Sequence, residues 1–126
     1  MKKEAYVFGV NNFSGADIDG IENSVYEFKK YIKDIEIIDE IVEDINKIER
    51  ENNNNLIIKN LNTVTNTNTR VFKFSDNLIK KGYIPILIGG DHSVAIGSIS
   101  ASSNNYNNLG IIWIDAHSDI NTEETT

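Results

Sequence analysis

The chain of 126 residues contains no cysteine, a single proline and a single tryptophan. The absence of cysteine excludes disulfides and thiolate metal sites, so a bound metal ion would need nitrogen and oxygen ligands. No apolar run approaches the ~20 residues that a membrane-spanning helix requires. The N-terminal MKKEAYVFGV is too short in apolar residues for a signal peptide, and Glu4 interrupts it. These absences favour a cytoplasmic protein that does not engage a membrane.

Basic residues are also scarce, because 12 Lys and Arg face 19 Asp and Glu and leave a net charge of −7. Phosphate binding requires clustered Lys and Arg, so we expect no nucleic-acid partner. The composition of 40% hydrophobic and 25% charged residues is typical of a soluble globular protein. The length suits one modest domain with its own core.

Short apolar runs predict buried strands at three places along the chain: 5–10 (AYVFGV), 84–88 (IPILI) and 109–114 (LGIIWI). Trp113, inside the last run, is expected in the core. The stretch 34–49 is ambiguous, since Ile35 and Ile37 alternate as in a strand while later isoleucines repeat as in a helix. It predicts a short strand that runs into a helix or a loop.

Apolar stripes predict helices between these strands. One helix face is indicated by four residues at spacings of four, three and four: Ile21, Val25, Phe28 and Ile32. A second helix is predicted over 66–81, with Gly82 as its C-terminal cap. A third follows the strand at 84–88, and its small residues would let it sit close on a sheet.

Strands that are apolar on both faces and alternate with helices indicate a sheet covered on both sides. The predicted fold class is therefore α/β, with three αβα layers and a mainly parallel sheet. Ligands of such folds bind at the carboxyl ends of the strands. Two polar motifs occupy those positions: GGDHS at 89–93 and DAHSD at 115–119.

Asp115, His117 and Asp119 follow the last apolar run at alternate positions. In an extended chain such side chains point to the same side, about 6.6 Å apart per pair. Two carboxylates buried together are costly without a cation, and a divalent metal removes that cost. His92, after the neighbouring predicted strand, is placed to add a further ligand. Both histidines of the chain thus fall in the predicted site.

A mixed carboxylate and imidazole set without sulfur suits manganese, zinc or iron, and oxygen-rich sets favour manganese. Two such ions about 3.5–4 Å apart would share a bridging carboxylate and activate a bridging water. Less specific interpretations stay open on these residues alone. GGD before a helix is also the pattern of a tight turn with Asp91 as the N-cap, and acidic residues gather at strand ends for solubility.

The two motifs closely resemble the metal-binding motifs of arginases, in the ureohydrolase superfamily: IGGDHSVAIGSISA at 88–101 and LGIIWIDAHSDINT at 109–122. The stretch FSGADIDGIENSVYEFKKYI at 13–32 is similar to the substrate-side loop and first helix of arginases, although the usual Gly-Pro near its end is missing. The resemblance implies an arginase-like fold and a homo-oligomer, a trimer or hexamer.

The resemblance also implies roles for individual residues at a site that holds two Mn²⁺ ions when complete. His92 would be a ligand of one ion, Asp115 a carboxylate that bridges both, and His117 a ligand of the second. Asp119 would bind the first ion and orient the bridging hydroxide, which makes it the implied catalytic residue. Asn121 would contact the α-carboxylate of the substrate. The implied reaction is hydrolysis of L-arginine to L-ornithine and urea.

The resemblance implies further ligands and catalytic residues that would follow Asn121, and the sequence reaches Thr126 without them. We therefore expect 1–126 to be the N-terminal part of a single arginase domain, inactive and marginally folded in isolation. An agmatinase or other guanidino-hydrolase is the alternative enzyme, and Asn121 favours arginase because agmatine has no carboxylate. A metal-binding remnant without catalysis is the alternative outside enzymes.

Overall fold

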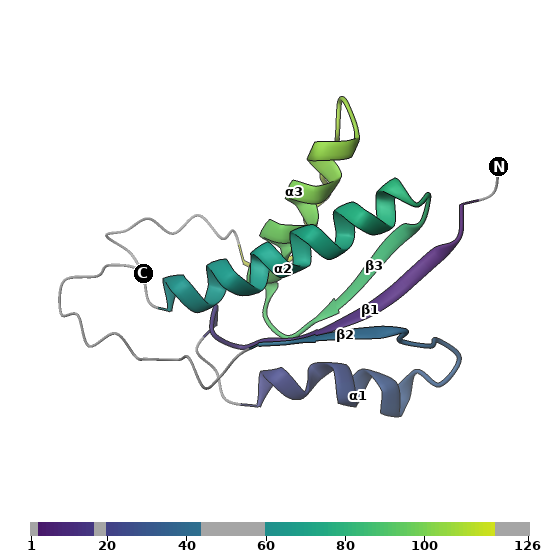
Figure 1. Ribbon diagram of the computed structural model, residues 1–126. Helices are drawn as coiled ribbons and strands as arrows, with labels where there is room; N and C mark the ends of the chain where they lie inside the picture. Colours follow the sequence, from purple (N-terminus) through teal and green to yellow (C-terminus); the bar gives the residue numbers. More distant parts are fainter. Residues whose placement is uncertain (1–2, 17–19, 44–59, 118–126) are drawn as a thin grey trace.

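The computed structural model describes residues 3–16, 20–43 and 60–117, which fold around a parallel three-stranded sheet of order β2-β1-β3 (Figure 1). The strands are β1 (Ala5–Asn11), β2 (Asp39–Val42) and β3 (Ile84–Gly89). The helices are α1 (Ser24–Tyr31), α2 (Leu61–Lys80) and α3 (Ala95–Asn105). Short 3-10 turns precede α1 and α3, namely η1 (Ile21–Asn23) and η3 (His92–Val94).

Helices cover both faces of this sheet. In Figure 1, α1 lies below the strands, and α2 and α3 lie on the opposite side. The chain runs from β1 through α1 to β2, and from β2 past β1 to β3, so that all three strands are parallel. This arrangement confirms the predicted α/β class with three layers and a parallel sheet.

The central strand β1 alternates its side chains between the two helix layers, and it confirms the strand predicted over 5–10. Phe8 and Val10 are fully buried, and the ring of Phe8 lies 4.8 Å from that of Phe74 in α2. Gly9 faces the other layer, where a Cβ atom would stand 2.6 Å from a methyl carbon of Val25 in α1. The missing side chain at Gly9 lets α1 pack directly on the strand.

The helix α2 begins at Leu61 rather than near Asn66 as predicted. Its first turns are rich in Thr and Asn, which favour turns and caps, so the sequence pattern concealed them. The predicted cap at Gly82 is confirmed, because its φ is 89° and its N–H donates to the Ile79 carbonyl at 2.9 Å. The core cluster on this side of the sheet comprises Phe8, Val10, Ile41, Val71, Leu78 and Val94.

The small residues of α3 serve a contact with α2 rather than with the sheet. A Cβ atom at Gly97 would lie 2.6 Å from the Asn68 carbonyl oxygen and 2.9 Å from the Val71 Cβ. The N–H of Gly97 also donates to the Asn68 side-chain oxygen at 2.7 Å. The two helices therefore touch through their backbones, and the prediction that α3 sits close on the sheet is wrong.

The strand predicted over 109–114 is also wrong, because these residues carry no strand hydrogen bonds. Ile112 and Ile114 are 90% and 93% exposed, and Trp113, expected in the core, is 47% exposed. Within the described residues, β3 pairs with β1 alone. An apolar run indicates a segment that would gain from burial, but it does not specify a hydrogen-bonding partner.

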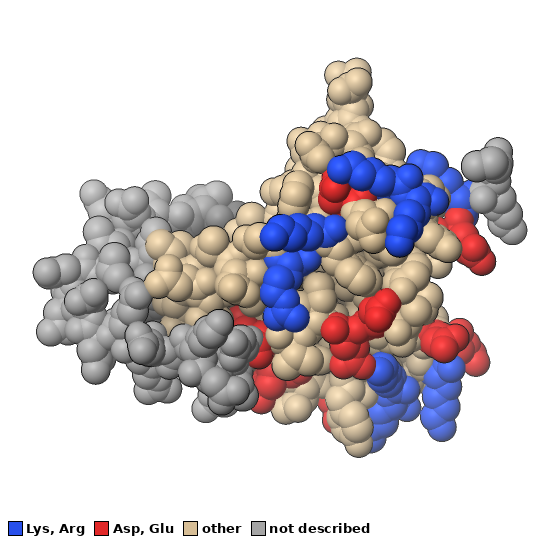
Figure 2. Space-filling model, in the orientation of Figure 1, with Lys and Arg blue, Asp and Glu red and all other residues tan. Residues whose placement is uncertain are grey.

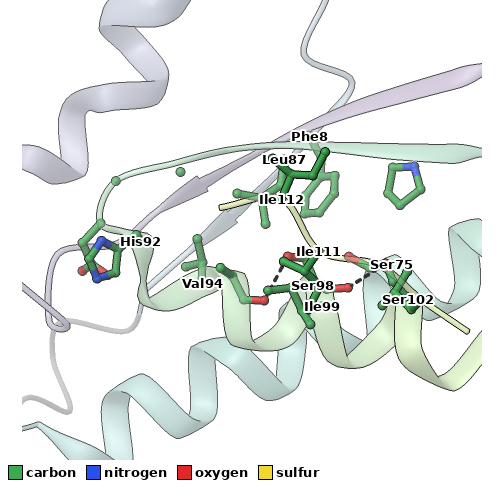
Figure 3. Close-up of a pocket in the computed structure, with 17 residues that line it drawn as sticks. Phe8, Ser75, Leu87, His92, Val94, Ser98, Ile99, Ser102, Ile111 and Ile112 are labelled. Atoms are coloured by element: carbon green, nitrogen blue, oxygen red, sulfur yellow. Dashed lines mark hydrogen bonds between the residues drawn. The ribbon is translucent and has the colours of Figure 1, made fainter. Parts of the chain in front are cut away.

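A groove of about 610 Å³ separates this segment from the sheet. Figure 3 shows the side chains that line it, which come mainly from β3, η3, α3 and residues 109–112, together with Phe8 of β1 and Ser75 of α2, and with His92 at one end. The ambiguous stretch 34–49 does contain a strand, β2, but at Asp39–Val42 rather than at the alternating Ile35 and Ile37. Residues 44–49 of that stretch lie outside the described part of the chain.

The surface carries charges of both signs. Figure 2 shows basic and acidic side chains close together over the region of α1 and β2, where Lys29 forms an ion pair with Glu40. None of the helices in the described segments is both long enough and apolar enough to cross a membrane.

Candidate functional site at the carboxyl ends of the strands

The connections of the sheet change direction at the carboxyl ends of its neighbouring strands β1 and β3. The helix after β1 lies on one face of the sheet and the helix after β3 lies on the other, which is the arrangement at which α/β folds bind ligands (Figure 1). Both predicted motifs fall in or beside this region. His92 is the first residue of η3, directly beyond β3, and Asp115 and His117 follow the 109–114 segment. Asp119 and Asn121 lie outside the described residues.

The structure brings the three described residues of the predicted site together around one carboxylate. The Nδ1 atom of His92 lies 3.6 Å from Oδ2 of Asp115, and Nδ1 of His117 lies 3.5 Å from Oδ1. The side chain of Asp115 is 22% exposed, whereas those of His92 and His117 are 61% and 86% exposed. One carboxylate with an imidazole at each oxygen is therefore the centre of the cluster.

A bend, rather than the extended chain predicted for this motif, joins Asp115 to His117. The backbone N–H of His117 donates to Oδ1 of Asp115 at 2.9 Å. This hydrogen bond, assisted by the imidazoles of His117 and His92, lowers the pKa of the Asp115 carboxyl below its ordinary value of 3.8. Asp115 is therefore ionised at neutral pH, which is the state required of a metal ligand.

Trp113 supports the cluster from the side. Its ring packs edge-to-face on the imidazole of His92, with centroids 5.7 Å apart and planes at 73°. This contact joins the turn after β3 to the segment that carries Asp115, and such aromatic pairs are worth about 0.5–1.5 kcal/mol beyond their burial. Trp113, interpreted from sequence as a core residue, is instead a neighbour of the candidate site.

The donor chemistry fits a divalent cation, because a carboxylate and two imidazoles provide oxygen and nitrogen and no sulfur. The residues come together in pairs, however, and no group of three or more His, Asp or Glu in the described ranges is spaced to hold a metal ion by itself. Within the described residues, the cluster therefore consists of one carboxylate with two imidazole neighbours.

Two buried carboxylates that the metal-site prediction left out hold the loop over this edge. Glu43, 3% exposed, follows β2 and accepts from the backbone N–H groups of Phe13 and Ser14 at 3.1 and 3.2 Å. Asp91, 6% exposed, follows β3 and accepts from the N–H groups of Gly15 and Ala16 at 3.0 and 3.3 Å. Four consecutive amides of the 13–16 loop are therefore divided between two carboxylates from different strands.

Asp91 has a second contact, on the other side. Its Oδ1 accepts from the N–H of Ser93 at 2.9 Å, which makes it the N-cap of η3. The interpretation of GGD as a capped turn is thus confirmed. The sequence pattern GGD indicated the cap. No local pattern indicated the 13–16 loop as the second partner of Asp91, because Gly15 is 76 positions away in the sequence.

The ends of β1 and β3 also meet directly. The N–H of Gly90 donates to the side-chain oxygen of Asn12 at 3.0 Å and to the Val10 carbonyl at 3.2 Å. A Cβ atom at Gly90 would overlap the carbonyl oxygen of Asn12. The second glycine of the GGDHS motif is therefore required by close backbone approach at the edge that carries the site.

Comparison with known proteins finds one matching family. The sequence model described as the arginase family matches residues 9–126. The chain is 44% identical to the arginase of Bacillus subtilis over 69 residues, which are 55% of this chain and 23% of that protein. It is 42% identical to an arginase of Staphylococcus aureus over 81 residues, which are 64% of this chain and 26% of that protein.

Solved structures agree with the sequence comparison. The structure superimposes on the arginase of Bacillus caldovelox with a TM-score of 0.81 and 29% identity, over 99% of this chain and 44% of that one. The arginase of Bacillus cereus gives a TM-score of 0.79 and 31% identity, over 98% of this chain and 43% of that one. The chain thus spans less than half the length of the solved arginases that it matches.

Proposed function

This chain belongs to the arginase family, and we propose from that premise that it supplies part of an arginase active site, for the hydrolysis of L-arginine to L-ornithine and urea. The observation that carries the proposal is the placement of two imidazoles around the carboxylate of Asp115, at distances of 3.5 and 3.6 Å. L-arginine as the substrate, and L-ornithine and urea as the products, are those that the resemblance to arginases implies.

Three described residues would hold Mn²⁺ at this site: His92, Asp115 and His117. Asp119, which the resemblance implies as a fourth ligand, lies outside the described residues, and the remaining ligands that the resemblance implies would follow Asn121. When bound, manganese supplies a Lewis acid and a water of lowered pKa for attack on a guanidinium carbon. Oxygen and nitrogen ligands of this kind suit manganese better than sulfur ligands do.

The residues of the chain contribute orientation and charge. The hydrogen bond from the His117 N–H fixes the Asp115 carboxylate and keeps it ionised, and the ring of Trp113 limits rotation of the His92 imidazole. Asn121 would bind the α-carboxylate of arginine through its side-chain amide, which is the basis for preferring arginine over agmatine. Asp119 would accept a hydrogen bond from the attacking water and set its direction.

A chimera tests this proposal directly. In it, this chain replaces the segment of the Bacillus caldovelox arginase on which it superimposes, so that one covalent chain contains both parts of the site. We expect urea release from L-arginine with Mn²⁺, little release from agmatine, and loss of activity on addition of a chelator. A His92→Ala chimera and an Asp115→Ala chimera should each lose activity by orders of magnitude together with bound manganese.

A matched control separates ligand loss from unfolding. Asp76→Asn removes a carboxylate at the far end of α2 and α3, where it accepts hydrogen bonds from Asn104 and Asn105, and it should retain both manganese and activity. A folded chimera that hydrolyses no arginine, or one that keeps its manganese after both ligand substitutions, would overturn the proposal.

A further inference from the structure

The 13–16 loop and the turn that carries His92 share a single buried carboxylate. The Oδ2 atom of Asp91 accepts from Gly15 and Ala16, and its Oδ1 atom accepts from Ser93, the residue after His92. Because Asp91 is 6% exposed, water cannot readily replace these donors. Hydrogen bonds to a carboxylate are the stronger kind, so all three amides gain from the negative charge.

The loop and the turn are also in steric contact at this point. A Cβ atom at Gly15 would stand 2.5 Å from Oδ1 of Asp91 and 2.5 Å from the hydroxyl oxygen of Ser93. The loop backbone therefore rests against both the carboxylate and the turn that it caps. A displacement of the loop at Gly15 would push directly on the residue next to His92.

The other half of the loop has a separate support. Glu43 accepts from Phe13 and Ser14, both through the backbone, and from the hydroxyl of Ser14 at 2.9 Å. Asn60 adds a hydrogen bond from its side-chain amide to the Ser14 carbonyl at 3.1 Å. These contacts do not involve Asp91, so the two halves of the loop are held independently.

We infer that Asp91 is a positioning residue that fixes the 13–16 loop and the His92 turn as one unit, so that the geometry of the candidate metal ligand depends on the loop. One consequence of this inference rests on the proposed function: the position of the 13–16 loop, which would contact no metal, should affect the affinity of the His92 site for manganese. The mechanical coupling itself depends on no bound ion.

Asp91→Asn is the sharpest substitution, because the amide keeps the size of the side chain but has only one acceptor oxygen. The NH₂ group of the asparagine must face either the Ser93 N–H or the N–H groups of Gly15 and Ala16. Two donors would then face each other, and the hydrogen bonds on that side would be lost. Amide hydrogen exchange in the 126-residue chain, resolved by residue, measures the result. We expect protection to fall by about tenfold or more at Ser93 or at both Gly15 and Ala16.

The amides of Phe13 and Ser14 serve as the internal control, since Glu43 holds them. They should keep their protection in Asp91→Asn. Asp76→Asn, the matched control, also removes one carboxylate that accepts three hydrogen bonds from two helices, and any fall in protection that follows from its lower stability should be shared by all five amides. A uniform loss across Phe13 to Ala16 in Asp91→Asn would indicate general destabilisation and overturn the inference.

Gly15→Ala perturbs the same contact from the loop and leaves Asp91 intact. We expect it to lower the protection of Ser93, and we expect Gly15→Ala and Asp91→Asn to be non-additive in a double-mutant cycle, whereas Asp76→Asn and Asp91→Asn should add. Unprotected Gly15, Ala16 and Ser93 amides in the unmodified chain, or additivity of the first pair, would overturn the coupling.

The consequence for the site is measured separately, as Mn²⁺ affinity and as KM and kcat for arginine in the chimera. Asp91→Asn and Gly15→Ala should both weaken Mn²⁺ binding about tenfold, and saturating Mn²⁺ should restore kcat. If the exchange data show coupling and no manganese binds, the proposed function fails while the coupling stands. If manganese binds and the exchange data show no coupling, the present inference fails alone.

Discussion

A Cβ atom at Gly90 would overlap the carbonyl oxygen of Asn12, because the backbones that leave β3 and β1 touch at the carboxyl edge of the sheet. The contact is reinforced by the hydrogen bond from the Gly90 N–H to the Asn12 side chain. The candidate site is built on this junction, since the next residues along the chain are Asp91 and His92. The effect of a substitution at position 90 on stability therefore tests whether the backbones at Gly90 and Asn12 are in contact.

We expect Gly90→Ala to lower the free energy of unfolding by about 2 kcal/mol or more, because the added methyl group meets backbone that cannot rotate away. Urea denaturation followed by circular dichroism measures the change. Gly110→Ala is the matched control, since a Cβ there meets nothing within 4 Å, and it should change stability by less than about 0.5 kcal/mol. Equal effects of the two substitutions would contradict the close approach.

Gly97→Ala tests the contact between α2 and α3, because we expect it to lower stability where a glycine-to-alanine change in a helix usually raises it. Alanine in a helix interior is usually better than glycine by about 1 kcal/mol. Here its methyl group would lie 2.6 Å from the Asn68 carbonyl oxygen, so we expect a net loss of about 1–3 kcal/mol in unfolding free energy. The exposed Ser103→Ala in the same helix gains propensity without the clash and should be neutral or stabilising. A stabilising Gly97→Ala would show that the helices stand further apart.

Asp76 ties the end of α2 to the end of α3 and gives a pH dependence of defined direction. Hydrogen bonds from Lys80, Asn104 and Asn105, with the Lys80 charge, lower its pKa from 3.8 to about 2. A folded-state pKa below the unfolded value means that the stabilisation is fully present above about pH 4. It is lost as the pH falls through about 2.

Asp76→Asn should therefore be less stable than the unmodified chain at neutral pH, and the difference should shrink between about pH 4 and pH 2. Urea midpoints measured across this range give the result. Asp34→Asn removes the same charge at an exposed position without these three donors, and it should show no comparable convergence. A difference that is constant from pH 7 to pH 2 would exclude the carboxylate of Asp76 as its source.

The parts of the fold that local patterns specify were predictable from the sequence. The strands at 5–10 and 84–88 are apolar on both faces, and the cap at Gly82 follows from a glycine just beyond a helical stripe. The strands and the cap need only a short window of sequence and a general rule. His92 and Asp115 do lie 3.6 Å apart as predicted, but the predicted reason does not hold, because residues 109–114 before Asp115 form no strand.

The parts that depend on distant partners were not predictable. Nothing in the windows around Glu43 or Asp91 indicates that each would accept two amides of the 13–16 loop, whose residues are 29 to 76 positions away in the chain. The start of α2 was missed because tertiary packing compensates for poor helix propensity in its first turns. The run at 109–114 was predicted as a strand because apolar character does not reveal whether a neighbouring strand supplies hydrogen bonds.

The exposed run at 109–114 leads to a prediction that separates the observed arrangement from the predicted strand. Ile112 is 90% exposed, whereas Leu78 is 4% exposed in the core. We expect Ile112→Ala to lower the free energy of unfolding by less than about 0.5 kcal/mol, and Leu78→Ala to lower it by about 2–5 kcal/mol. Urea denaturation of both variants gives the comparison. If Ile112→Ala costs as much as Leu78→Ala, the 109–114 segment is buried against β3 as its apolar pattern suggests, and the groove of about 610 Å³ beside β3 is filled in solution.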